Sequence, residues 1–425
     1  MRRALVAFVV VALAAACTAA GPQDRAEVRV MVAGDPEELL AYRAVADAYA
    51  AAGGGPVQLL EIEARDALIS RLSTAIAAGN PPDLFLLNYR YYGQFREAGA
   101  LASMQGRLDD SESLDADAFF PAAMEAFRDG GEQTCVPQNA ASLVLYYNAG
   151  LFADAGIDTP PDDWTWDDMV AAARTLTTDD DGDGTVDVYG LGVEPEIIRV
   201  APFIWSGGGE VVNDDDDPRW LAMDSVKAAV ALQAFLELRQ FHGVVPTDEE
   251  AESEDLETRF LRGGLAMLME SRKVVPTFRT IEGFDWDVAA LPRLGPEPVS
   301  ILHSDAYCMP VDAAHPDEAW RFLEFALGPE GQAITAGAGR TVPSLMSVAS
   351  SEAFLTPGAE PSNSQVFLDQ LTSVRSVPNI ARWPEIEDAV NALLEEAFYE
   401  PAIAPETPEL IAAMQFATDP LFPGG

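Results

Sequence analysis

One segment of the chain carries acidic residues at a spacing that suits a divalent cation. Its oxygen donors match the first five ligand positions of an EF-hand calcium loop: Asp179, Asp181, Asp183, Thr185 (through its backbone oxygen) and Asp187. Gly184 provides the turn, but Gly190 stands where the loop needs a bidentate glutamate. The sequence requires no cofactor, and it leaves structural calcium and a solvated acidic turn as two interpretations of this segment.

Polar residues that could bind a small ligand follow three apolar runs near the start of the chain. The runs are residues 28–33, 57–62 and 84–87, and their composition predicts β-strands. Between them, apolar residues recur at helical spacing, so the segment predicts a β-α-β-α-β unit. Such units form parallel sheets with right-handed connections, and ligands bind at the edge where the strands end.

At that edge the sequence places four candidates: Asp35, Asp66, Asn88 and Tyr89. Asp35 and Asp66 also suit the N-cap of the helix that follows each strand, where a carboxylate accepts a backbone N–H. Glu38 sits where it can complete a capping box with Asp35. Capping is therefore the favoured main role of both aspartates, with ligand binding as the second.

The composition limits the classes of function. The chain has 425 residues, with 69 Asp and Glu against 26 Lys and Arg, and a formal net charge of −43. This acidity argues against nucleic acid or an anionic membrane surface as a partner, because like charges repel. A hydrophobic content of 48% excludes wholesale disorder, and the length predicts two or three domain-sized units. With three histidines and no cysteine cluster, the sequence predicts no zinc site.

The N-terminus resembles a bacterial lipoprotein signal. Two arginines precede an apolar run, residues 4–16, which is too short to span a membrane, and small residues lead to Cys17. The resemblance implies cleavage before Cys17, a signal peptide of residues 1–16 and a lipid-anchored tether of residues 17–26. We therefore expect an extracytoplasmic protein attached to the cell membrane only through its lipid. An ordinary soluble export signal is the alternative.

Export also bears on the two other cysteines. Cys135 and Cys308 remain once Cys17 is lipidated, and an even pair in an oxidising compartment predicts one disulfide. Two separate buried thiols are the alternative.

A series of motifs runs along the chain from residue 135 onward. Residues 135–139 and the run Leu-Val-Leu-Tyr-Tyr-Asn at 143–148 are similar to a "YGLP…VLYYN" signature. Further motifs follow at residues 151–156, 164–168, 205–210, 260–267, 284–288, 291–292 and 315–320. In this order they resemble the extracellular solute-binding proteins, family 1, which are the sugar-binding lipoproteins or periplasmic proteins of ABC importers. No single motif is diagnostic, but the ordered series covers nearly the whole mature chain.

The resemblance implies an α/β chain with the periplasmic-binding-protein-like type II fold. Two doubly wound α/β lobes would be joined by a multi-strand hinge around a ligand cleft. Lobe 1 would comprise residues 27–135 and 291–332, and lobe 2 would comprise residues 138–287 and 337–425. The chain would cross between the lobes near residues 135–139, 288–290 and 331–337, and a disulfide between the two cysteines would staple the hinge side of lobe 1.

The resemblance also implies a function. The protein would be the monomeric substrate-binding component of an ABC importer, capturing a mono- or oligosaccharide and delivering it to the transmembrane subunits of the permease. It would not be an enzyme, and the sequence has no nucleophile elbow, HExxH or other catalytic signature. The alternatives are a secreted carbohydrate-active hydrolase, a lipid-anchored scaffold, and a binder of a sugar acid or phosphorylated polyol.

Carried over position by position, the family's cleft gives ligand-binding candidates in both lobes. In lobe 1 these are Asp35, Asp66, Asn88, Tyr89, His303 and Asp305. In lobe 2 they are Asn139, Trp205, Gly207, Gly208, Arg272, Arg340 and Trp383. Sugars present hydroxyls and apolar faces, so carboxylates, amides and aromatic platforms suit them. Arg272 stands where many relatives carry an aromatic residue, so it could stack on a sugar or pair with a charged ligand.

Overall fold

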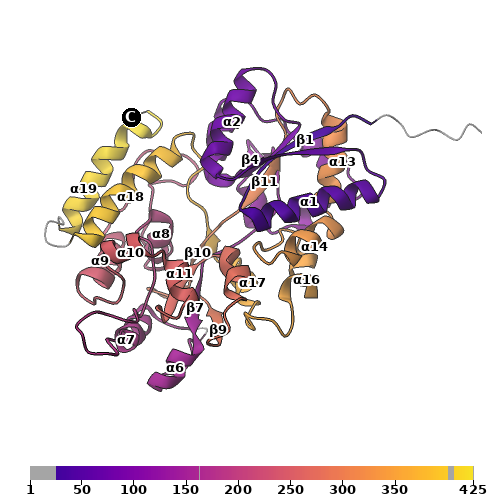
Figure 1. The fold of residues 1–425 in the computed structure, drawn as a ribbon. Coiled ribbons are helices and arrows are strands. Elements are labelled where there is room, and N and C mark those ends of the chain that lie inside the picture. Colours follow the sequence, from indigo (N-terminus) through magenta and orange to yellow (C-terminus); the bar gives the residue numbers. More distant parts are fainter. Residues whose placement is uncertain (1–24, 162, 401–405, 425) are drawn as a thin grey trace, which may run out of the picture.

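The computed structural model describes residues 25–161, 163–400 and 406–424 (Figure 1). The predicted signal peptide, Cys17 and most of the predicted tether lie outside these residues. Within them, no helix has both the length and the apolar character that crossing a membrane requires. The described chain forms two groups of elements, each with its own β-sheet, and segments far apart in the sequence meet in each group (Figure 1).

The first sheet has five strands in the order β2-β1-β3-β11-β6. Their bounds are Val28–Ala33 (β1), Val57–Ile62 (β2), Leu84–Asn88 (β3), Cys135–Pro137 (β6) and Asp305–Cys308 (β11). Strand β1 pairs in parallel with β2 and β3, as the sequence predicts. The late strand β11 lies antiparallel between β3 and β6, and this insertion gives the sheet the predicted type II arrangement.

Helices pack around this first sheet. Their bounds are Pro36–Ala51 (α1), Arg65–Ala77 (α2), Pro316–Leu327 (α13) and Pro329–Gly337 (α14). Helices α1, α2 and α13 contact β1, and α14 packs on α1 and α13. Tyr49 at the end of α1 meets Phe322 of α13 edge to face, with ring centroids 5.4 Å apart. This contact joins the first and the last parts of the group.

Helix α1 has a side-chain cap at its N-terminus, whereas helix α2 has none. At α1 the Asp35 carboxylate accepts the backbone N–H of Glu38 at 3.3 Å, as predicted. The reciprocal bond of a capping box is absent from the contacts described for Glu38, so its carboxylate is free for another role. Helix α2 begins at Arg65 with Ala64 as its N-cap, so the predicted capping by Asp66 is wrong.

The second sheet has three strands in the order β8-β7-β9, with both pairings antiparallel. The bounds are Val144–Asn148 (β7), Met267–Glu270 (β8) and Trp286–Ala289 (β9). Tyr146 of β7 packs between Phe278 and Trp286, with ring centroids 5.4 and 5.8 Å away. Four helices pack against one another on the left of Figure 1: α8 (Ile197–Ser206), α9 (Val226–Gln240), α18 (Trp383–Tyr399) and α19 (Thr407–Thr418).

The remaining elements are mostly short. The helices are α3 (Tyr92–Glu97), α4 (Gln105–Asp109), α5 (Pro121–Glu125), α6 (Ala149–Ala155), α7 (Trp166–Leu176), α10 (Asp248–Ser253), α11 (Leu256–Leu261), α12 (Val275–Phe278), α15 (Met346–Ala349), α16 (Glu352–Leu355) and α17 (Val366–Gln370). The 3-10 turns are η1 (Tyr89–Tyr91), η2 (Ala116–Ala118), η3 (Arg272–Val274) and η4 (Asp419–Leu421). Two hairpin strands are β4 (Arg128–Asp129) and β5 (Glu132–Gln133), and β10 (Ser300–Ile301) pairs in parallel with β12 (Val374–Arg375).

The chain passes from the first sheet to the second between β6 and β7, and it returns between β9 and β11. Ala141 and His303, one from each passage, exchange two backbone hydrogen bonds of 2.7 and 2.8 Å. The third predicted crossing, residues 331–337, falls within α14, and α15 and α16 pack against that helix. The exact lobe boundaries stay a prediction.

The two cysteines within the described residues lie opposite each other on neighbouring strands. Cys135 of β6 and Cys308 of β11 are in register, and a disulfide with an S–S distance of 2.00 Å joins them. Both residues are fully buried. The bond therefore ties the strand that precedes the first passage to the strand that follows the second.

Candidate functional site

A cavity of about 340 Å³, called the cleft below, lies where the two groups of elements face each other. From the first group, the residues that line it are Glu38, Arg65, Asn88, Arg90 and Asp305. From the second group they are Glu194, Glu196, Ile198, Arg199, Glu270, Ser271 and Lys273. The passages and the segment after α14 add Asn139, Ala141, His303, Arg340 and Thr341. Five lining residues are acidic and five are basic, and no Phe, Tyr or Trp is among them.

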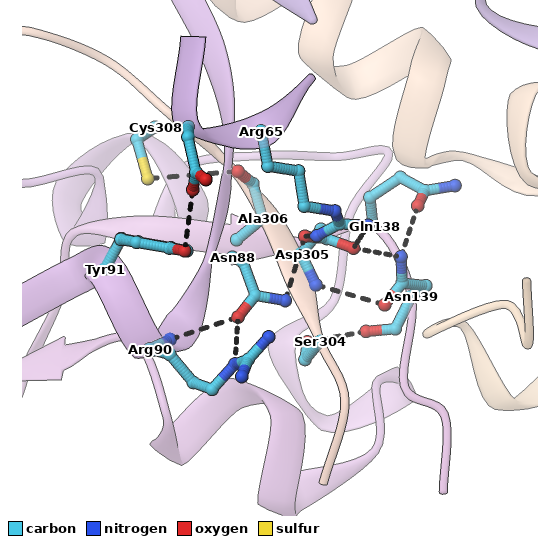
Figure 2. A network of polar contacts seen from close by, with 11 residues as sticks. Arg65, Asn88, Arg90, Tyr91, Gln138, Asn139, Ser304, Asp305, Ala306 and Cys308 are labelled. Atoms are coloured by element: carbon cyan, nitrogen blue, oxygen red, sulfur yellow. Dashed lines mark hydrogen bonds and ion pairs between the residues drawn. The ribbon is translucent and has the colours of Figure 1, made fainter. Parts of the chain in front are cut away.

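Asp305, at the start of β11, organises the first wall. Its carboxylate accepts hydrogen bonds from Arg65 Nη1 at 2.6 Å and from the side-chain amides of Asn88 and Asn139, both at 3.1 Å (Figure 2). Asn139 also accepts the backbone N–H of Asp305 at 3.0 Å. Burial alone would raise the pKa of Asp305, but Arg65 and these hydrogen bonds outweigh burial and hold the pKa below its usual value. The carboxylate is therefore ionised, and both of its oxygens already accept hydrogen bonds from residues of the protein.

Glu270, at the end of β8, organises the opposite wall. Its carboxylate lies 2.8 Å from Arg199 Nη2 and 3.1 Å from Lys273 Nζ. Arg199 also donates to Glu194 at 2.9 Å, and its side chain is only 4% exposed. Burial acts to raise the pKa of Glu270, but the two cations outweigh burial and lower the pKa to about 2. A buried cation and a buried carboxylate thus hold each other in the charged state.

Two further ion pairs flank the cleft. Arg340 pairs with Asp35, the N-cap of α1, and Arg90 pairs with Glu387 of α18. The Arg90–Glu387 pair joins the segment after β3 to a helix of the second group. Every basic residue that lines the cleft therefore has a carboxylate partner.

Several buried polar atoms of the cleft have no hydrogen-bond partner among the described residues. These are His303 Nε2, Thr341 Oγ1, Arg199 Nε and Arg340 Nε. Burial, with smaller contributions from Arg90 and Arg199, lowers the pKa of His303 to about 3, so its imidazole is neutral. An unpaired buried polar atom costs free energy. These atoms offer free hydrogen-bonding positions to a polar ligand in the cleft.

Comparison with known proteins identifies the family. The model for the family of bacterial extracellular solute-binding proteins matches residues 33–333. The chain belongs to this family. Its members bind solutes without transforming them, so the protein is a binding protein and not an enzyme.

Relatives of this solute-binding protein share its length and fold. A putative binding protein of Brucella abortus is 24% identical over 394 residues, covering 89% of this chain and 90% of the relative. The ABC substrate-binding protein Lmo0181 from Listeria monocytogenes, solved with cycloalternan, superposes with a TM-score of 0.83 at 22% identity, covering 94% of this chain and 100% of that one. The sugar-binding protein MalE from Xanthomonas citri gives 0.80 at 20% identity, covering 93% and 97%. These likenesses show the two-lobed maltose-binding-protein type of fold.

The cleft of this solute-binding protein brings together part of the predicted set. Asn88, Asn139, His303, Asp305 and Arg340 all line it. They come from the ends of β3 and β11, from both passages and from the segment after α14. Asp35, also predicted, reaches the edge of the cleft through its ion pair with Arg340.

The predicted aromatic residues lie away from the cleft. Trp205 is 6% exposed and the guanidinium of Arg375 lies 4.8 Å from its ring centroid. Trp383 is fully buried at the start of α18. Tyr89 is 1% exposed, and its hydroxyl accepts the backbone N–H of Val377 at 3.4 Å. None of the three lines the cleft, and ligand binding by them stays a prediction.

Three other predicted residues also lie outside the cleft lining. Asp66 is exposed on α2, where it accepts the hydroxyl of Tyr91 at 3.2 Å. Gly207 ends helix α8, and Gly208 has a φ of +76° beside the Lys227 side chain. Gly208 serves the turn after α8, because a positive φ is strained for residues with a Cβ.

Arg272 lies outside the cleft lining, one position before a residue that is part of it. It is fully buried, with its guanidinium 4.1 Å from the ring centroid of Phe354 and 5.1 Å from that of Phe367. The 3-10 turn after β8 directs the next residue, Lys273, into the cleft instead. Sequence spacing alone cannot separate these two neighbours, because the tight turn sets which side chain faces inward.

Sequence reasoning missed most of the charged residues of the cleft. These are Glu38, Arg65, Arg90, Glu194, Glu196, Arg199, Glu270 and Lys273. Two signals were available. Arg65 and Arg90 neighbour predicted residues at strand ends, and Glu194-Pro195-Glu196 directly follows a buried run and precedes an apolar helix. Glu38 was assigned to a capping box, which concealed its position on the cleft.

The predicted calcium loop, residues 179–187, contributes no residue to the cleft lining. Carboxylate oxygens of Asp179, Asp181 and Asp187 lie within 4.8 Å of one another, and all three residues are exposed. Asp183 accepts the backbone N–H of Thr185 at 2.7 Å and is outside that group. Three of the five predicted ligands therefore converge, and calcium binding stays a prediction.

Proposed function

We propose that this protein is the substrate-binding component of an ABC importer that captures a sugar or a related polyhydroxylated solute in the cleft. The observation that carries the proposal is the set of unpartnered buried polar atoms on the cleft, from His303, Thr341, Arg199 and Arg340. Hydroxyl groups donate and accept hydrogen bonds, so a polyol can satisfy such a mixed set. A wholly apolar ligand would leave each atom unpaired.

The relatives support a carbohydrate ligand. The Listeria protein was solved in complex with cycloalternan, and the Xanthomonas protein is described as sugar-binding. The cleft volume of about 340 Å³ is near the lower end for ligand pockets, which favours a mono- or disaccharide over a longer chain. The absence of Phe, Tyr and Trp from the described lining favours recognition by hydrogen bonds and charge over ring stacking.

The proposal includes attachment and delivery. Processing before Cys17 would leave the protein tethered to the outer face of the membrane by its lipid, close to the permease. The two sheets, linked by the passages at residues 138–143 and 290–304, can close on the ligand by a hinge motion. The closed form would then dock on the transmembrane subunits.

A thermal-shift screen of mono- and oligosaccharides, followed by titration calorimetry and product analysis, tests the proposal. We expect at least one sugar to raise the melting temperature and to be recovered intact. The variants Asn139→Ala and His303→Ala should weaken that binding, whereas Asp66→Ala, outside the cleft, should not. Hydrolysis of the sugar would contradict the proposal, and so would the absence of any response across the panel.

A further inference from the structure

The charges around the cleft do not cancel. The basic residues are Arg65, Arg90, Arg199, Lys273 and Arg340. The carboxylates on the lining and in its flanking pairs are Asp35, Glu38, Glu194, Glu196, Glu270, Asp305 and Glu387. Seven carboxylates thus face five cations, and His303 adds no charge because its imidazole is neutral.

Two carboxylates account for the excess. The carboxylate of Glu38, on α1, takes part in none of the hydrogen bonds or ion pairs found among the described residues. The carboxylate of Glu196, at the N-cap position of α8, lies 3.9 Å from Arg199 Nε and accepts no hydrogen bond from the described residues. They come from opposite walls of the cleft. Burial is the main cause that raises the pKa of Glu38 and that of Glu196, although the Glu196 side chain is still 38% exposed.

The cations, in contrast, are already paired. Arg65 lies 2.6 Å from Asp305, Arg199 lies 2.8 Å from Glu270, and Lys273 lies 3.1 Å from the same Glu270. The other two cations pair with Asp35 and Glu387. An anionic ligand would therefore compete with carboxylates that already hold these groups, and Arg272, the residue that pointed to a charged ligand, does not reach the cleft.

The electrostatic field of the whole protein also favours a cationic ligand over an anionic one. The formal net charge of −43 attracts cations and repels anions on approach. Salt weakens this long-range effect, but it screens carboxylates inside a cleft much less. The approach and the site therefore favour the same sign of ligand charge.

We propose that the cleft selects a compact polyhydroxylated ligand that carries a basic amine, such as an amino sugar, and discriminates against sugar acids. This inference rests on the proposed function and specifies its ligand class. The ammonium group and the hydroxyls would donate to Glu38 and Glu196 from opposite sides. The unpartnered Arg199 Nε and Arg340 Nε would donate to oxygens of the same ligand.

The test compares each parent sugar with derivatives that carry a positive charge, a negative charge or a neutral substituted amine. Glucose, galactose and mannose are titrated by calorimetry at neutral pH beside their 2-amino, N-acetylamino and uronic acid counterparts. We expect at least one amino sugar to bind about tenfold or more tightly than its neutral parent, because a charge-assisted hydrogen bond replaces a neutral one. Acetylation of the amine should abolish that advantage, and the uronic acid should bind most weakly.

Variants assign the preference to the two carboxylates. Glu38→Gln and Glu196→Gln should each reduce the ratio of amino-sugar to parent-sugar affinity, and the double variant should remove it. Glu37→Gln, the exposed neighbour on α1, is the matched control and should keep the ratio of the unmodified protein. Circular dichroism and melting curves of each variant show whether it is folded. If one of the two single variants does not fold, the other still tests the inference.

The outcomes separate the inference from the proposed function. Neutral or acidic sugars binding at least as tightly as amino sugars would overturn the inference and leave a sugar-binding protein. A preference for amino sugars that survives in the folded double variant would also overturn it. No binding by any member of the panel would count against both.

Discussion

The guanidinium of Arg65 and the carboxylate of Asp305 lie 2.6 Å apart, although 240 positions separate the two residues in the chain. Arg65 begins helix α2, and Asp305 begins strand β11. Strand β11 returns to the first sheet after the chain has built the second one, so the pair fixes the end of that return passage. The side chain of Arg65 is 45% exposed while that of Asp305 is 12% exposed, so the contact lies at the surface of the cleft.

Asp305→Ala should destabilise the protein and impair ligand binding. The substitution removes the acceptor for Arg65 and for the buried amides of Asn88 and Asn139. Water can hydrate Arg65 instead, whereas Asn88 and Asn139 are buried and would each lose a hydrogen bond, so we expect the free energy of unfolding to fall by about 2–3 kcal/mol. Urea melts monitored by circular dichroism measure the change. Asp66→Ala on the exposed start of α2 is the control and should change stability by less than about 0.5 kcal/mol.

The disulfide should contribute strongly to stability. It joins Cys135 to Cys308, which are 173 residues apart, and the entropy of closing so long a loop in the unfolded chain predicts up to about 5 kcal/mol. Reductant should lower the midpoint of guanidinium unfolding for the unmodified protein. The double variant Cys135→Ala with Cys308→Ala should melt near that reduced value and should not respond to reductant. Two reactive thiols in the unfolded, unreduced mature protein would contradict the bond.

The sequence was sufficient to predict β1, β2 and β3 of the first sheet, because their pattern is local. Residues 28–33 and 57–62 are strands with the predicted bounds, and the third strand extends by one residue to Asn88. Parallel pairing then follows from the handedness of the connections. The position of β11 depends on contacts far along the chain, and the family resemblance predicted only that residues 291–332 belong to the same lobe. The same reasoning explains why Asn88 was found from strand ends, whereas Asp305 was not.

The charged cleft could not be predicted from residue types, because pairing and side-chain direction decide which charges meet a ligand. Glu38 satisfies the pattern of a capping box, yet its carboxylate faces the cleft. Arg272 and Lys273 are adjacent, and only the 3-10 turn after β8 shows that the first packs on Phe354 and the second faces inward. Trp383 begins helix α18, where the sequence predicts a ligand contact, but its side chain is fully buried.

Acid should weaken the fold partly through Glu270. Its pKa is about 2 in the folded protein, because Arg199 and Lys273 outweigh the effect of burial, whereas an unfolded glutamate has a pKa of about 4.3. The folded carboxylate therefore binds its proton less readily, so its stabilising contribution is present above about pH 4.3 and is lost as the pH falls towards 2. We expect this contribution to be on the order of 3 kcal/mol at neutral pH.

Urea melts from pH 7 to pH 3 measure this linkage. Glu270→Gln should be less stable than the unmodified protein at pH 7, and the difference should shrink below about pH 4.3. Glu252→Gln, on exposed helix α10, is the control and should follow the unmodified protein at every pH. A stability difference for Glu270→Gln that stays constant through acid would show that the substitution acts through packing and not through the charge.

Calcium should stabilise the protein through the loop of residues 179–187, where carboxylates of Asp179, Asp181 and Asp187 converge. Without a bidentate glutamate we expect weak binding, in the roughly millimolar range of extracellular modules. A tenfold excess over the dissociation constant would then add about 1.4 kcal/mol to the free energy of unfolding. Because any salt relieves self-repulsion in a chain of net charge −43, the measurement compares CaCl2 with MgCl2 at equal ionic strength. Asp181→Asn should abolish the difference between the two ions, whereas Asp216→Asn in the other acidic loop should preserve it, and equal stabilisation by both ions would leave the segment a solvated acidic turn.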